Sequence, residues 1–162
     1  MLHRLIHTRD DHLLTLLRIC LGVIFFAHGA QKVLGWWGGP GFTPTVNTFG
    51  STGIPARLAI LAMMAEFLGG IGLVFGFLTR IAAFGIAIVM AVAVLLVHAQ
   101  NGLFMNWTGH QGGEGFEYHL FAIVIAVTLI ARGAGAWSVD RLIAGGLSGV
   151  HTGFRHPLPH HG

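Results

Sequence analysis

Residues 58–78 read LAILAMMAEFLGGIGLVFGFL, an apolar run that is interrupted by a single carboxylate, Glu66. A helix needs about 20 apolar residues to cross roughly 30 Å of hydrocarbon. Three further apolar stretches, at 13–34, 81–99 and 118–131, approach or reach this length, and the last is the shortest. Backbone amides in lipid must pair within their own segment, so helices are expected. The sequence therefore predicts an all-α integral membrane protein, a four-helix antiparallel bundle.

The composition supports this fold class. Of the 162 residues, 54% are hydrophobic and 9% are charged, and the mean hydropathy is +0.72. These values are outside the range of soluble domains, and the length suggests one domain. We expect a cytoplasmic N-terminal segment at 1–12, a four-span transmembrane domain at 13–145 and a flexible tail at 146–162 that is rich in His, Gly and Pro.

The positions of Lys and Arg predict the orientation. If both termini are cytoplasmic, the inner side carries more of these residues than the outer side, which fits the positive-inside rule. We expect a multi-pass protein of a bacterial inner membrane with both termini inside. The net charge of +3 is then a topology signal and not a nucleic-acid footprint. The inner residues are Arg4, Arg9, Arg80, Arg132, Arg141 and Arg155, and the outer ones are Lys32 and Arg57.

Ionisable residues inside the apolar stretches are the strongest functional signal. A charge at the bilayer centre costs from about 3 to over 10 kcal/mol, so such residues must pair or line a cavity. Arg18 is near the inner boundary, where we expect its long side chain to reach water. The complete set is Arg18, His28, Lys32, Glu66 and His98.

Glu66 is expected to point into the bundle. It shares a helix face with Gly69 and Gly70, and the G-x-x-x-G spacing of Gly72 and Gly76 favours close approach of a neighbouring helix. On the first span, His28 and Lys32 are one turn apart, with Gln31 beside them. Their depth, counted from the ends of the spans, is similar to that of Glu66. We predict that Glu66 pairs with His28 or Lys32 in the outer half of the bundle.

A second polar layer is expected nearer the outer surface. His98 ends the third span, and Glu117 and His119 begin the fourth, although Glu117 would also suit the dipole of a helix N-terminus. The long outer loops at 35–55 and 100–116 contain Trp36 and Trp107. These aromatic residues favour either an interfacial belt or a lid over a pocket between the helices.

Three uses of these polar groups are open. His and carboxylate side chains can bind a metal, but no helix offers two ligands at metal spacing, so we expect no metal. They can instead hydrogen-bond the carbonyls of a quinone and relay protons, or form ion pairs that fix the helix register. The predicted catalytic residues are Glu66 and His28, and the predicted binding residues are Arg18, Lys32, Gln31, His98, Glu117, His119, Trp36 and Trp107.

Five motifs in order along the chain resemble the DoxX family of four-helix membrane proteins over about residues 12–145. They are RICLG at 18–22, HGAQK at 28–32, AEFLGG at 65–70 with Gly76, EYHL at 117–120 and AWSVD at 136–140. The resemblance carries over Arg18, His28, Lys32, Glu66, Glu117 and His119.

The resemblance implies a role in redox metabolism. Members of this family are linked to thiosulfate:quinone oxidoreduction, to quinone or catechol stress and to membrane thiol-redox complexes with soluble partners. This chain has one cysteine, Cys20, and no haem, flavin or iron–sulfur motif, so its electrons would have to come from a partner or a bound quinone. The expected function is a membrane component of a redox system that binds quinone. The alternative is a non-catalytic accessory subunit that anchors or stabilises a larger complex.

Overall fold

The structure is a computed structural model that describes residues 6, 8 and 10–152, with side chains described as far as residue 145. The described part is all-α, as predicted. Its α-helices are α2 (His12–Leu34), α3 (Phe42–Ser51), α4 (Ala56–Phe75), α5 (Thr79–Ala93), α6 (Glu117–Arg132) and α7 (Val139–Thr152). A π-turn at Val94–His98 and a 3₁₀ turn at Ala99–Asn101 extend α5, and a second 3₁₀ turn lies at Trp36–Gly38.

Three of the described helices are long and apolar enough to cross a membrane, namely His12–Leu34, Ala56–Phe75 and Thr79–Asn101. They correspond to the first three predicted spans. The fourth predicted span corresponds to α6, whose 16 residues measure about 24 Å. This helix is shorter than the other three but packs along α5, so its far end returns to the level at which α5 begins.

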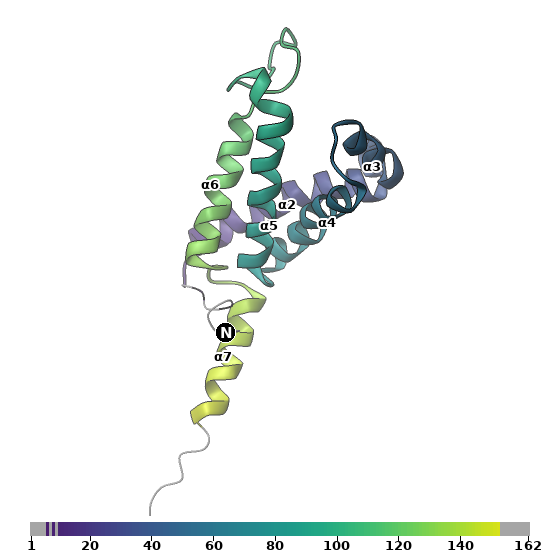
Figure 1. Cartoon of the computed structure of the whole chain (residues 1–162). Coiled ribbons are helices and arrows are strands. Elements are labelled where there is room, and N and C mark those ends of the chain that lie inside the picture. Colours follow the sequence, from purple (N-terminus) through teal and green to yellow (C-terminus); the bar gives the residue numbers. More distant parts are fainter. Residues whose placement is uncertain (1–5, 7, 9, 153–162) are drawn as a thin grey trace, which may run out of the picture.

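The helices form two antiparallel pairs, α2 with α4 and α5 with α6 (Figure 1). The pairs meet near the start of α7 and diverge toward α3 on one side and the 102–116 loop on the other. We call the region where the pairs meet the α7 end. The opposite region, which contains α3 and the 102–116 loop, is called the loop end. Both the start of α2 and the end of α6 lie at the α7 end. A shared apolar core joins the pairs, and it includes Leu21, Phe25, Leu73, Ile86 and Leu129.

Glycines allow α2 and α4 to approach closely. A Cβ atom on Gly70 would lie 2.3 Å from the backbone nitrogen of Phe26, and one on Gly29 would lie 2.5 Å from the Cα of Phe67. No larger side chain fits at such separations without backbone movement. The predicted close approach is therefore present, but Gly76 takes no part in it as a helix residue. Gly76 ends α4 in the left-handed conformation, with φ of 69°.

The long segment at 35–55, predicted as a loop, contains α3. This helix turns the chain back from α2 to α4, and Pro44 is tolerated in it because the first turn of a helix needs no backbone N–H donor. At the other end of the molecule, Ser138 caps α7, since its hydroxyl accepts a hydrogen bond from the Arg141 amide at 3.3 Å. Helix α7 continues through Thr152 and so includes the first residues of the predicted tail, whose remainder lies outside the described residues.

Arg18 does not reach water, contrary to the prediction. Its side chain is only 1% exposed, because the guanidinium donates hydrogen bonds to four backbone carbonyls. Two of them, those of Leu73 and Val74, belong to the last turn of α4, and two, those of Ala134 and Trp137, belong to the segment between α6 and α7. The positive charge thus lies where the dipole of α4 is negative and its last carbonyls lack helical partners.

At the start of α5, Asp140 binds backbone amides, as Arg18 binds backbone carbonyls at the end of α4. Its carboxylate is 1% exposed and accepts hydrogen bonds from the backbone amides of Leu78, at 2.8 Å, and Thr79, at 3.0 Å. A negative charge is favourable at a helix N-terminus. One residue further on, Arg141 forms a bidentate pair with the exposed Asp10, and this hydrogen bonding lowers the pKa of the Asp10 carboxyl. Asp140 therefore joins α7 to the α4–α5 turn, and Arg141 joins α7 to the segment before α2.

We expect Arg18→Met to destabilise the protein by at least about 3 kcal/mol, because it leaves four buried carbonyls without their charged donor. Thermal unfolding in detergent, followed by circular dichroism, measures the loss. Arg57→Met is the matched control, since Arg57 is exposed at the start of α4. Equal melting temperatures for the two variants would contradict the structural role of Arg18.

Candidate functional site

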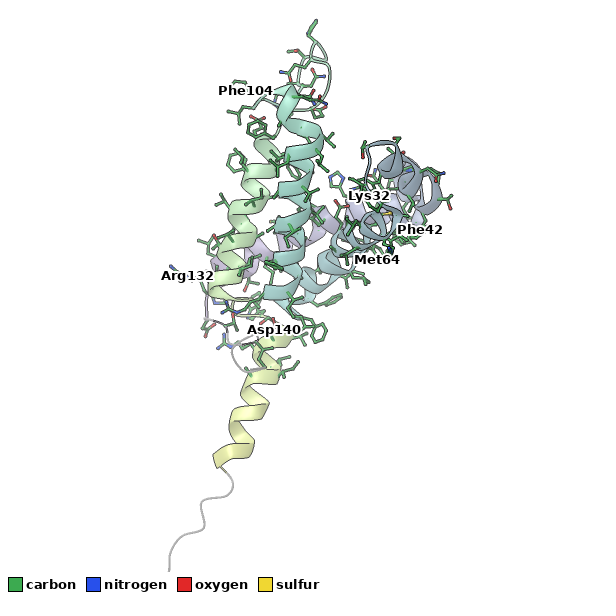
Figure 2. The ribbon with its side chains drawn as sticks, in the orientation of Figure 1. Lys32, Phe42, Met64, Phe104, Arg132 and Asp140 are labelled. Atoms are coloured by element: carbon green, nitrogen blue, oxygen red, sulfur yellow. The ribbon has the colours of Figure 1, made fainter. Side chains whose placement is uncertain are left out.

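An ion pair between Lys32 and Glu66 joins α2 to α4 near the loop end, as predicted. The Glu66 side chain is 4% exposed and that of Lys32 is 28% exposed, so the carboxylate is the deeper partner. Figure 2 shows Lys32 on the side of α3, far from Asp140 at the α7 end. Glu66 shares the buried face of α4 with Gly69 and Gly70, as predicted.

Tyr118, on α6, packs against α2 near His28 and was not predicted as a site residue. Its ring stacks on Phe25 with a centroid separation of 6.5 Å and lies 6.4 Å from the imidazole of His28. The tyrosine hydroxyl is buried and has no hydrogen-bond partner among the described residues. The available sequence signal was its position between Glu117 and His119 at the start of an apolar span.

His119 and His98 form a second contact, between α6 and the end of α5. Their ring centroids are 4.1 Å apart, His119 is 7% exposed, and its Nδ1 is buried without a partner among the described residues. His98 is the last residue of the π-turn, a widened helical turn that is often found at functional sites. Its Nδ1 lies 2.8 Å from the carbonyl oxygen of Glu114 in the 102–116 loop, so the two histidines lie near the loop end.

These groups interact electrostatically across the two helix pairs. The charges of Lys32 and Glu66 act on His28, which is exposed on α2. The charge of Glu66 also acts on Tyr118, and that of Lys32 acts on His119. We call this group the polar cluster; its members are His28, Lys32, Glu66, His98, Tyr118 and His119.

Other predicted residues at the loop end lie outside the polar cluster. Glu117 accepts hydrogen bonds from the Trp107 indole and the Met105 amide, both at 3.3 Å, and so holds the 102–116 loop. Trp107 is 85% exposed. Trp36 packs edge to face on Phe26, with a centroid separation of 6.3 Å.

Two further predicted residues have structural contacts. The backbone carbonyl of Gln31 accepts a hydrogen bond from the Gly41 amide at 3.1 Å and ties the end of α2 to the start of α3. Arg18 lies at the α7 end, away from the polar cluster, and its guanidinium is occupied by backbone carbonyls. The structure therefore does not bring Arg18 to the predicted site.

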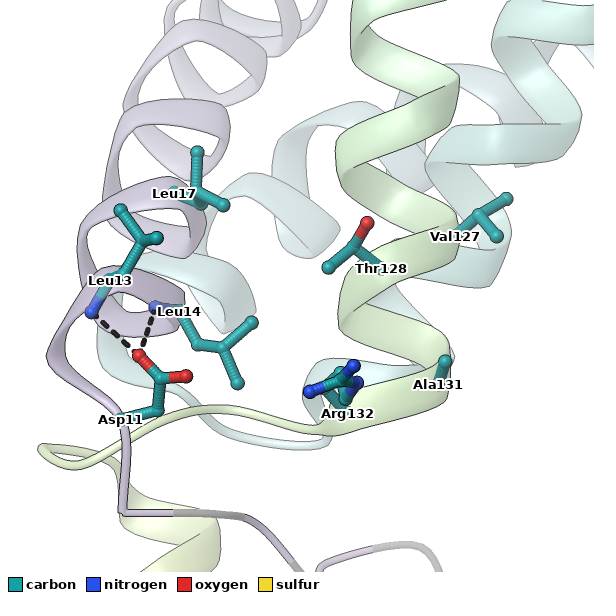
Figure 3. Close-up of a pocket in the computed structure, with 8 residues that line it drawn as sticks. All are labelled: Asp11, Leu13, Leu14, Leu17, Val127, Thr128, Ala131 and Arg132. Atoms are coloured by element: carbon teal, nitrogen blue, oxygen red, sulfur yellow. Dashed lines mark hydrogen bonds between the residues drawn. The ribbon is translucent and has the colours of Figure 1, made fainter.

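A cleft of about 390 Å³ lies between the start of α2 and the end of α6, away from the polar cluster (Figure 3). Three leucines, Leu13, Leu14 and Leu17, line it on the side of α2. Asp11 is occupied in capping α2, with bonds of 2.9 and 3.2 Å to the amides of Leu13 and Leu14. Thr128 donates to the Val124 carbonyl at 2.8 Å. Asp11 and Thr128 thus serve the helices, and we take the polar cluster as the candidate site.

The chemistry of the polar cluster is that of hydrogen bonding and proton exchange. No three His, Cys, Asp or Glu side chains within the described ranges are placed to hold a metal ion. The cluster instead offers an ammonium group, a carboxylate, three imidazoles and a phenol in an apolar setting. Intramembrane groups of this kind serve as proton relays and ligand counter-ions.

The two partners of the ion pair should respond differently to substitution. Lys32→Met leaves a buried carboxylate without its counter-ion, whereas Glu66→Gln leaves an ammonium group that is already partly exposed. We expect Lys32→Met to lower the free energy of unfolding by about 3 kcal/mol and Glu66→Gln by less, with partial recovery in the double variant. Thermal unfolding of the four proteins of this cycle measures the coupling. Additive losses would show that the pair contributes no coupling.

The comparison with known proteins agrees with the fold and the motifs. The family model described as DoxX matches residues 13–99. "Putative oxidoreductase CatD" of Bacillus subtilis (strain 168) is 32% identical over 114 residues, which cover 70% of this chain and 75% of that protein. "Inner membrane protein YqjF" of Escherichia coli (strain K12) is 30% identical over 132 residues, covering 78% of this chain and 88% of that protein.

A further relative is an uncharacterized membrane protein of Mycobacterium tuberculosis, 30% identical over 148 residues that cover 87% of each chain. No solved structure matches this chain. The family match covers more than half of the sequence, and the relatives align with it over most of their length. This chain belongs to the DoxX family of membrane proteins.

Proposed function

We propose that this protein is a membrane component of a redox system and that it binds a quinone at the polar cluster. The observation that carries the proposal is the Lys32–Glu66 pair between α2 and α4, together with the buried Tyr118 hydroxyl and His119 Nδ1 on α6, which have no partner among the described residues. A purely structural ion pair needs no further polar groups beside it. The name of the Bacillus subtilis relative, "Putative oxidoreductase CatD", supports the same class of function.

The residues of the polar cluster fit a quinone. A quinone ring is apolar on its faces and carries carbonyl oxygens that accept hydrogen bonds. The cluster supplies donors at Lys32 and His28, and aromatic side chains such as Phe25 and Tyr118 lie beside them. A bound quinone would supply the capacity to exchange two electrons, which the side chains of this chain lack, together with two protons.

Each side chain of the polar cluster would have a role that depends on its position. Lys32 and His28 would donate hydrogen bonds to a carbonyl oxygen, and Glu66 would hold the charge of Lys32 and accept a proton. His119 and His98 would carry protons toward the loop end, where His98 already contacts the Glu114 carbonyl. The electrons would be exchanged with a partner redox protein of the membrane or of the adjoining aqueous phase.

The proposed orientation has both termini in the cytoplasm and the polar cluster in the outer half of an inner-membrane protein. Arg80, Arg132 and Arg141 lie at or near the α7 end, whereas Lys32 and Arg57 lie toward the loop end. The positive-inside rule then assigns the α7 end to the cytoplasm. The name of the YqjF relative, an inner membrane protein, supports the location.

The quinone proposal predicts saturable binding. A ubiquinone analogue with a decyl tail should raise the melting temperature of the purified protein and quench its tryptophan fluorescence. Glu66→Gln and Lys32→Met should weaken this binding about tenfold, the effect of losing one charged hydrogen bond. Arg57→Met should bind as the wild type does, and it is the control for the loss of a charged side chain outside the polar cluster.

The accessory-subunit alternative makes a different prediction for the same variants. It requires that other membrane subunits copurify with the protein in mild detergent and that quinone leaves the melting temperature unchanged. Copurification that persists in Glu66→Gln, without quinone binding by the wild type, would replace the redox proposal by this alternative.

The proposed orientation can be tested with reporter fusions in a Gram-negative host. Green fluorescent protein at the C-terminus should fluoresce, because it matures in the cytoplasm, whereas alkaline phosphatase inserted after Gly109 should be active, because it needs the periplasm. The reverse pattern of the two reporters would overturn the orientation.

A further inference from the structure

Two polar atoms of α6 are buried without any partner in the part of the chain that the structure describes. They are the hydroxyl oxygen of Tyr118 and the Nδ1 of His119, which belong to adjacent residues. The His119 side chain is more than nine-tenths buried. Leaving a buried polar group unpaired is costly, and polar groups that are buried in native proteins are nearly always satisfied. Their partner is therefore expected to be something other than the described residues.

The packing contacts of the Tyr118 side chain involve its ring and not its hydroxyl. Its contacts with Phe25, His28 and His119 are contacts between rings, with centroid separations of 6.5, 6.4 and 5.6 Å. A phenylalanine would make all three. The hydroxyl is therefore a buried hydrogen-bond donor that the packing does not use. The negative charge of Glu66 acts on it.

We propose that Tyr118 and His119 form a second hydrogen-bonding pole of the ligand site, opposite the Lys32–Glu66 pole. This inference rests on the proposed function and narrows it: the ligand carries two oxygens on opposite sides of one ring, as a 1,4-quinone does. One oxygen is bound from α2 by Lys32, and the other accepts a hydrogen bond from the Tyr118 hydroxyl on α6, with His119 beside it. Binding thus joins the two helix pairs.

The chain offers a direct probe, because Tyr118 is its only tyrosine. Protein labelled with ¹³C at the tyrosine Cζ gives a single resonance that reports the hydrogen bonding of this hydroxyl. Titration of the full chain in detergent with decylubiquinone should shift that resonance along the same saturation curve as the tryptophan fluorescence. Binding that quenches tryptophan but leaves the resonance in place would overturn the second pole, and would indicate a water as the partner.

Tyr118→Phe tests the same hydrogen bond by affinity. The ligand-free variant should melt at the same or a higher temperature, because an unpaired buried hydroxyl has been removed, whereas decylubiquinone should bind about tenfold more weakly. A decyl-substituted cyclohexenone, which has one carbonyl, should bind the variant and the wild type equally. Lys32→Met serves as the comparison and should weaken the binding of both compounds.

The outcomes separate the two proposals. If decylubiquinone binds the wild type and Lys32→Met weakens it while Tyr118→Phe does not, the second pole is wrong and the proposed function stands. If decylubiquinone does not bind the wild type at all, both are overturned. A Tyr118→Phe protein that loses stability without ligand would also count against the second pole, since the hydroxyl would then have a structural partner.

Discussion

The structure depends on one buried guanidinium. Arg18 reaches the last carbonyls of α4 and those of the segment that leads into α7, so a single side chain on α2 joins three parts of the chain that are distant in sequence. A charge in hydrocarbon is acceptable only with such partners. Two of these carbonyls belong to the last turn of α4, where intrahelical donors run out, and the other two belong to the non-helical segment between α6 and α7. Each side of this interaction therefore requires the other.

Asp140 adds a second charged contact at the α7 end. Asp140 supplies the α5 amides with acceptors close to where Arg18 supplies the α4 carbonyls with donors, so both helix ends at the α4–α5 turn meet a charge of the favourable sign. Close packing of the turn is required as well. A Cβ atom on Gly76 would lie 2.4 Å from the Cβ of Ser138 and 2.9 Å from the guanidinium carbon of Arg18.

The loop end uses charge in a different way. At the α7 end Arg18 and Asp140 are matched by backbone partners, whereas two polar atoms at the start of α6, near the loop end, have no partner among the described residues. The first arrangement suits rigidity, and the second supports our proposal of a ligand that supplies the missing hydrogen-bond partners. The π-turn that follows α5 ends at His98, where it contacts His119.

Part of the site could be predicted from local geometry. Helical periodicity placed Glu66 on the glycine face of α4 and His28 with Lys32 on one face of α2, and depth counting set them at one level, so their pairing followed. The same reasoning could not identify Tyr118, because a tyrosine near the start of an apolar helix is commonly an interfacial residue. It misplaced Arg18 for a related reason: only the folded chain shows which carbonyls lie within reach.

The sequence alone determined that this is an all-α membrane protein, because hydrocarbon requires long apolar segments with internally paired backbones and makes each intramembrane charge exceptional. The tertiary structure decided which helices are neighbours and which charges meet. All the spans are similarly apolar, so hydrophobicity does not distinguish one partner from another. That choice came from backbone contacts at Gly22, Gly29 and Gly70 and from hydrogen bonds between distant segments, which exist only once the helices are packed.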